Sequence, residues 1–179
     1  MAYSSAKNTI KLKKYLNIIE EYEAEAAIIP GELIELNSSG NVQVHSTAGG
    51  NSLHMFALED ELQGNGIDDA YAAGDRVQVW IPTRGDQVYA ILADGNDVSI
   101  GDFLESNGSG ELQLHTPDFM NYESADSDTT ITAYTNQIVG VALEAVDTSG
   151  SSGEESSGGG YDSDIDPLGY NRRIIIRVK

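Results

Sequence analysis

Two histidines, His45 and His115, end two short segments of alternating residues, Val-Gln-Val-His and Leu-Gln-Leu-His. A pair of imidazoles could bind a metal or transfer protons. Alternation along a strand, however, puts the aliphatic residues on the inward face and the Gln and His residues on the outward face. The chain has no cysteine, and its histidines lack the spacing typical of zinc sites. We therefore expect both imidazoles to be exposed to solvent or to an interface, with no metal bound.

A second candidate for metal chemistry lies near the C-terminus. Asp162, Asp164 and Asp166 have the spacing of the first three ligands of a calcium loop. An EF-hand also requires Gly at position 6 and Glu at position 12, where this chain has Pro167 and Arg173. The EF-hand interpretation therefore fails, which leaves open loose association with Ca²⁺ or a solvated acidic loop.

Two other features have structural as well as functional interpretations. Residues 84–86 spell Arg-Gly-Asp, a tripeptide found in receptor ligands, but residues 83–86 also fit a hairpin turn. Trp80 could stack on a sugar ring, whereas its place in the run Val-Gln-Val-Trp-Ile-Pro favours packing in a core or an interface. We expect the turn and the packing role.

Motifs for covalent or phosphoryl chemistry are lacking. The chain has no G-x-S-x-G elbow, no H-E-x-x-H, no P-loop and no dinucleotide-binding glycine pattern between a strand and a helix. It also has no cysteine nucleophile. We therefore predict no catalytic residues, no metal and no cofactor, which indicates that the protein is not an enzyme.

From Pro30 onward the sequence consists of short alternating runs separated by Gly, Asn, Asp and Ser. This pattern is typical of an all-β sandwich or barrel. The expected strands are residues 32–36, 41–46, 54–58, 76–81, 87–92, 102–105, 111–115, 138–144 and 173–178.

An internal duplication is the strongest long-range signal. Residues 31–46 align without gaps on residues 101–116, and each identical pair is separated by 70 positions. The identical pairs are Gly31/Gly101, Glu35/Glu105, Asn37/Asn107, Ser39/Ser109, Gly40/Gly110, Gln43/Gln113 and His45/His115. Later segments repeat in the same order, since residues 56–59 resemble 141–144 and residues 76–81 resemble 173–178. We infer two related β-barrel or sandwich modules.

These observations divide the chain into an N-terminal arm at 1–29, a first module at 30–92 and a second at 93–179. The second module contains an acidic, Gly/Ser-rich loop at 147–166, which cannot bury apolar surface. The arm is expected to be helical or extended and to be ordered mainly by what it contacts.

Charge is distributed unevenly over the 179 residues, whose net charge is −19. Residues 20–171 contain all 29 acidic residues and only two cations, Arg76 and Arg84, whereas both ends of the chain are basic. Binding to nucleic acid and to anionic membranes depends on Lys and Arg, so the acidic body disfavours both. No apolar window is long enough to cross a membrane.

Several segments resemble a known family. Ile29-Pro-Gly-Glu-Leu-Ile-Glu-Leu followed by a hairpin, then Gln137-Ile-Val-Gly-Val-Ala-Leu-Glu, a loop and an Arg-rich terminal strand, is similar to the capsid decoration, or head cement, proteins of tailed bacteriophages. The chain departs from the simple form of this pattern by its second copy, longer arm and acidic insertion.

The resemblance implies a virion protein on the outer surface of the capsid, made in the host cytoplasm. It would bind the lattice of the major capsid protein between capsomers, often as a trimer, and stabilise the head. We expect residues 7–29 to grip the lattice, and deletion of residues 1–28 to abolish binding but leave the β-body folded. The expected contacts are Lys7, Lys11, Leu12, Lys13, Lys14, Tyr15, Leu16, Ile18 and Ile19.

Three alternatives stay open at this point. The main one is a carbohydrate- or receptor-binding β-sandwich of a virion fibre or adhesin, acting through Trp80 and surface tyrosines. The others are a hydrolase of unfamiliar type and an acidic mimic of DNA.

Overall fold

The computed structural model describes residues 7–124, 127–133, 137–149 and 173–179. Every regular element in these ranges is a β-strand, which confirms the all-β prediction. Each predicted strand overlaps an observed one. The prediction left barrel and sandwich modules open; the described sheets are open, so the barrel alternative is wrong.

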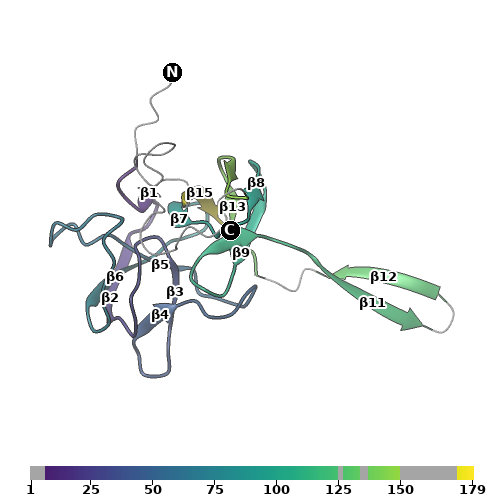
Figure 1. Ribbon diagram of the computed structural model, residues 1–179, viewed down its shortest axis with the longest axis horizontal. Coiled ribbons are helices and arrows are strands. Elements are labelled where there is room, and N and C mark those ends of the chain that lie inside the picture. The colour runs from purple at the N-terminus through teal and green to yellow at the C-terminus, as the bar shows by residue number, and fades with distance from the viewer. Residues whose placement is uncertain (1–6, 125–126, 134–136, 150–172) are drawn as a thin grey trace, which may run out of the picture.

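Two sheets form the body of the molecule (Figure 1). The five-stranded sheet has the order β2-β6-β5-β3-β4, and the six-stranded sheet has the order β1-β7-β15-β13-β9-β10. The first comprises β2 (Ile18–Glu23), β3 (Leu33–Leu36), β4 (Val42–Val44), β5 (Met55–Ala57) and β6 (Arg76–Ile81). The second comprises β1 (Lys11–Lys13), β7 (Gln87–Ile91), β9 (Phe103–Ser106), β10 (Leu112–Leu114), β13 (Gly140–Ala142) and β15 (Arg173–Val178).

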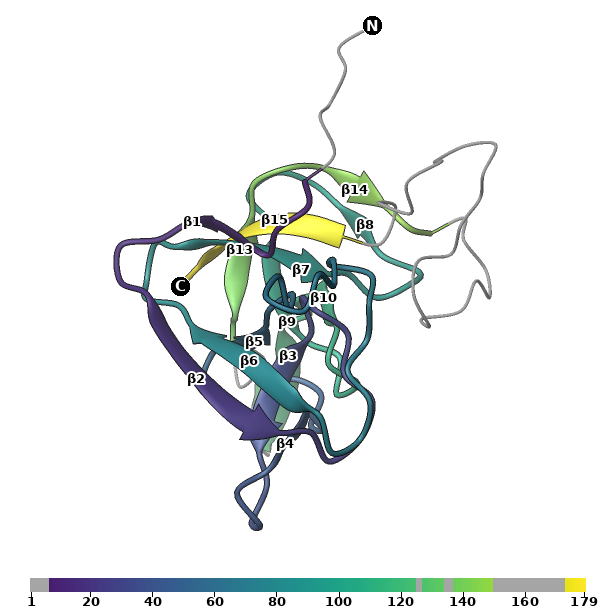
Figure 2. The ribbon, with the colours of Figure 1, turned by 90° about the vertical axis from the view of Figure 1, so that its left-hand side faces the viewer.

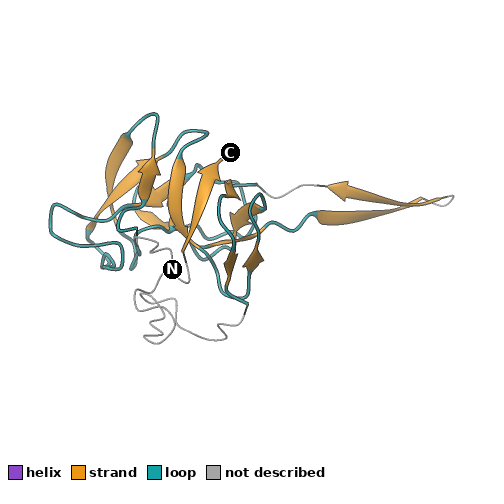
Figure 3. Cartoon of the chain, turned by 90° about the horizontal axis from the view of Figure 1, so that it is seen from above, coloured by secondary structure: helices purple, strands orange, loops and turns teal. Residues whose placement is uncertain are grey.

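Two smaller sheets complete the described fold. Strands β8 (Asp97–Val98) and β14 (Val146–Asp147) pair beside the six-stranded sheet. Strands β11 (Asp118–Ser124) and β12 (Ser127–Ala133) form a hairpin that projects away from the body (Figures 1 and 3). Neither pair was predicted, although the run Thr-Thr-Ile-Thr within β12 is rich in β-branched residues, which favour strands.

One hydrophobic core joins the two large sheets. It takes Leu33, Phe56 and Trp80 from the five-stranded sheet and Val88 and Ile176, among others, from the six-stranded sheet. A second cluster covers the opposite face of the five-stranded sheet, where it includes Ile34, Met55, Ala57, Val77 and Val79. Because both faces of its central strands β5 and β6 are largely buried, simple alternation of apolar and polar residues does not identify an exposed side there.

The two large sheets share their hydrogen-bonding pattern. Strands β3 and β4 pair Glu35 with Gln43, and β9 and β10 pair Glu105 with Gln113 in the same register. In the two hairpins, the side-chain oxygen of Asn37 accepts from Ser39 N–H at 2.9 Å, and that of Asn107 accepts from Ser109 N–H at 2.8 Å.

The match extends beyond the hairpins to the strand order. Strands β6, β5, β3 and β4 correspond to β15, β13, β9 and β10, and β2 occupies the place that β7 has in the other sheet. Strand β7 lies within the predicted first module, residues 30–92, but it pairs with β15 and β1 in the six-stranded sheet.

Residues 7–29 run along one side of the body in extended conformation (Figure 2). Strand β1 pairs with β7, and β2 pairs with β6, so the segment passes from one sheet to the other. Ile10 and Ile28 are buried in the two clusters. The helical alternative is wrong. Deletion of residues 1–28 would remove core side chains and the edge strands β1 and β2, so we now expect it to destabilise the body as well.

Candidate contact surface

The connection from β1 to β2 exposes apolar side chains next to cations. Tyr15 is 83% exposed, Leu16 57%, Ile18 44% and Ile19 37%. Lys13 and Lys14 are exposed immediately before them. Exposed apolar groups that gather in one place are typical of a contact surface. We call residues 13–19 the β1–β2 surface.

The other residues predicted for lattice binding are less accessible. Lys7 is partly buried, and its Nζ lies 5.4 Å from the centre of the Tyr89 ring. Lys11 and Leu12 are also partly buried, and Leu12 packs against the main core. Burial, reinforced by the nearby charge of Lys14, lowers the pKa of Lys11. These three residues therefore serve the packing of β1 as well as its surface.

A buried carboxylate fixes the β1–β2 surface to the body. Asp86 is fully buried, and its Oδ1 accepts a hydrogen bond from the Tyr15 N–H at 2.7 Å. Its Oδ2 accepts from the N–H and the hydroxyl of Thr83, at 2.8 and 3.1 Å. A carboxylate that satisfies several donors at once holds both chain segments in place. Tyr15 is thus exposed at its side chain and anchored at its backbone.

The burial of Asp86 also decides between the two interpretations of the Arg-Gly-Asp tripeptide, a receptor ligand or a turn. Receptor recognition of this tripeptide would require an accessible carboxylate, whereas Asp86 is buried and occupied by Thr83 and Tyr15. Gly85 has a φ of +101° in the turn. The turn interpretation of residues 83–86 is therefore confirmed. Sequence reasoning identified this turn but not the contact of Asp86 with Tyr15, because the two residues are far apart in the chain.

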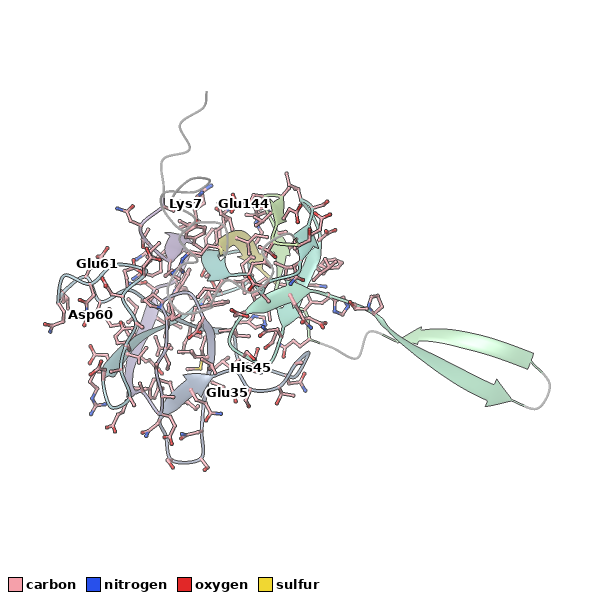
Figure 4. All side chains as sticks on the ribbon, in the orientation of Figure 1. Lys7, Glu35, His45, Asp60, Glu61 and Glu144 are labelled. Atoms are coloured by element: carbon pink, nitrogen blue, oxygen red, sulfur yellow. The ribbon has the colours of Figure 1, made fainter. Side chains whose placement is uncertain are left out.

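The predicted exposure of the two matching histidines is wrong, since both are buried. His45 Nδ1 lies 2.7 Å from Ser106 Oγ, and His115 Nδ1 lies 2.5 Å from Glu105 Oε2. His45 follows the end of β4 and contacts Ser106 on β9 of the other large sheet, and Figure 4 shows it beside Glu35. Alternation along a strand separates its two faces but does not show whether the polar face is also covered, so it could not reveal this burial.

The residue types of Glu35, His45 and Ser106 are those of a Ser-His-Glu catalytic triad. The His45 Nε2 to Glu35 Oε2 distance is 3.8 Å, and the Ser106 hydroxyl also accepts from the Gly108 N–H at 3.1 Å. Ser106 and His45 are both fully buried, so a substrate has no access to the hydroxyl oxygen. The arrangement instead joins β9 to the segment after β4.

Trp80 lies in the main core with no exposed surface. The packing interpretation is confirmed, and the proposed stacking of Trp80 on a sugar is wrong. Asp162, Asp164 and Asp166 and most of the acidic loop at 147–166 lie outside the described residues. The described part of the chain contains no cluster of three or more potential metal ligands, and no helix there could span a membrane.

Comparison with known proteins gives no relative: no family model matches the chain, and no curated protein matches it significantly.

Proposed function

We propose that the protein is a capsid decoration protein that binds the outer surface of an assembled bacteriophage head between capsomers and stabilises it. The observation that carries this proposal is the β1–β2 surface, where cations and exposed apolar groups lie together on a chain whose net charge is −19. Anchoring by Asp86 supports a contact role because a fixed surface loses little conformational entropy on binding.

The proposal also covers the oligomeric state of the protein and the origin of its two large sheets. The protein acts as a homo-oligomer, with a trimer favoured, so that several copies of the surface engage the lattice together and raise the avidity. The matching registers of β3–β4 and β9–β10 support descent of the two sheets from one duplicated module. Each module then offers related loops to neighbouring subunits of the major capsid protein.

Co-sedimentation with procapsids and expanded heads of the virus that encodes the chain tests this function. The double variant Tyr15→Ser/Leu16→Ser removes two apolar contacts without removing a strand. We expect its affinity for heads to fall about tenfold or more, the effect of losing a central aromatic contact. The matched control is Leu62→Ser/Ile100→Ser, which changes side chains that are 87% and 71% exposed elsewhere.

Two results would contradict the proposal. One is that the unaltered protein fails to sediment with heads at any stage of their maturation. The other is that the two double variants lose affinity equally, because the β1–β2 surface would then have no special role.

A further inference from the structure

A depression of about 680 Å³ lies beside Tyr15. Its volume is within the range of ligand sites, roughly 300 to 1,000 Å³. The lining residues are Lys13, Lys14, Tyr15, Gly85, Gln87 and Arg177. Three of these six are cations in a chain whose net charge is −19, so the depression is locally basic.

Sheet register arranges two of these cations in a row. Lys13 on β1 is opposite Gln87 on β7, and Gln87 is opposite Arg177 on β15. Residues opposite each other in neighbouring strands project from the same face, and adjacent strands lie about 4.8 Å apart. Lys13 and Arg177 are therefore about 10 Å apart at the backbone, with the amide of Gln87 between them.

The row has no internal counter-ion within the described part of the chain. Lys13, Lys14 and Arg177 form no ion pair with a described carboxylate. The carboxylate of Asp86, in the adjacent turn, is buried and accepts its hydrogen bonds from Thr83 and Tyr15. Three exposed cations on an acidic protein are thus available to an external anion.

The shape of the site favours a short acidic peptide over other anions. Residues two apart in an extended chain lie on the same face about 7 Å apart, a separation that the long Lys13 and Arg177 side chains can bridge. Arg177 can bind a carboxylate with two parallel hydrogen bonds. A single small anion would engage only part of the row, and a long polyanion such as a nucleic acid would be repelled by the acidic body.

We propose that this depression binds an extended acidic peptide segment, whose carboxylates contact Lys13 and Arg177 and whose apolar groups pack on the ring of Tyr15. Assigning the segment to the major capsid protein rests on the proposed function. Binding of an acidic peptide to the isolated protein does not rest on it.

Calorimetric titration of the full chain with a blocked tetraglutamate peptide tests this proposal, with tetraglutamine and inorganic phosphate as comparison ligands. We expect tetraglutamate to bind more tightly than either, and its affinity to fall as salt is added. The variant Lys13→Gln/Arg177→Gln should weaken tetraglutamate binding about tenfold or more, because two charge-assisted contacts are lost. The control Arg76→Gln/Lys179→Gln removes the same total charge outside the depression and should change affinity less than about twofold.

Each contrary result has a definite meaning. Absence of tetraglutamate binding, or equal loss in the two double variants, would overturn the site. Phosphate binding as tight as that of tetraglutamate would replace the peptide with a small anion. If tetraglutamate binds but the protein does not bind heads, the site stands and the proposed function fails. If the protein binds heads but not tetraglutamate, the proposed function stands and the site fails.

Discussion

The carboxylate of Asp86 and the backbone N–H of Tyr15 are joined by a 2.7 Å hydrogen bond across 71 positions of sequence. This contact ties the turn between β6 and β7 to the connection between β1 and β2. It therefore couples the stability of the body to the position of the surface that we propose to bind the capsid.

Replacing Asp86 with Ala should destabilise the protein by about 2 kcal/mol, because partly buried donors on Tyr15 and Thr83 lose a fully buried acceptor. Chemical denaturation measures this change. Arg84→Ala is the matched control in the same turn, and because Arg84 is exposed its cost should stay within about 0.5 kcal/mol. Equal costs for the two variants would show that Asp86 is not an anchor.

Arg173 and Arg76 begin corresponding strands, β15 and β6, but only Arg173 is buried. Its guanidinium donates to the carbonyl oxygens of Pro30 at 2.7 Å and Ile67 at 2.6 Å. Arg173→Met should cost about 3 kcal/mol because these buried oxygens lose their donors. Arg76→Met should cost less than about 0.5 kcal/mol in the same denaturation experiment. A cost of Arg173→Met no greater than that of Arg76→Met would refute this assignment.

Stability should depend on pH through Glu32. Burial raises the pKa of this carboxyl group from 4.5 to about 7. The folded protein therefore holds the proton more tightly than the unfolded chain does, and the contribution of Glu32 to stability is lost as pH rises from about 4.5 to about 7. The loss amounts to about 3 kcal/mol.

Urea denaturation between pH 4.5 and 8 measures this effect against Glu32→Gln, whose side-chain oxygen can still accept the 2.8 Å hydrogen bond from the Ile29 N–H. The variant should lack this component of the pH dependence and should be the more stable protein at pH 8. Parallel stability curves for the two proteins would contradict the raised pKa.

Two corresponding glycines should respond differently to substitution. Gly40 and Gly110 have φ values of +85° and +81°, which an L-residue adopts with strain of about 1 kcal/mol. A Cβ at Gly40 would meet nothing within 4 Å, whereas one at Gly110 would lie 3.0 Å from the Val44 Cβ. Thermal or chemical unfolding should show that Gly110→Ala costs more than Gly40→Ala, by about 1 kcal/mol or more. Equal costs would mean that the contact between the hairpin and Val44 relaxes freely.

Local sequence predicted nine of the strands in the two large sheets and the turns of the β3–β4 and β9–β10 hairpins. Alternation over residues 76–81 and 87–92 and the Asn and Gly residues of the 37–41 and 107–111 turns gave correct elements, because these signals depend on neighbouring residues alone. The sequence also identified residues 7–29 as an arm in which cations lie beside apolar groups. Its interpretation as an arm separate from the body missed the pairing of β1 with β7 and of β2 with β6.

Tertiary structure decided the burial of His45 and His115, the membership of β7 in the six-stranded sheet, and the contact between Asp86 and Tyr15. The period-two pattern separates the two faces of a strand but does not say which faces another sheet will cover. The row of Lys13, Gln87 and Arg177 likewise exists only because three strands from distant parts of the chain pair in one register. The sequence therefore determines which residue types the surface offers, whereas long-range strand pairing decides which of them lie side by side.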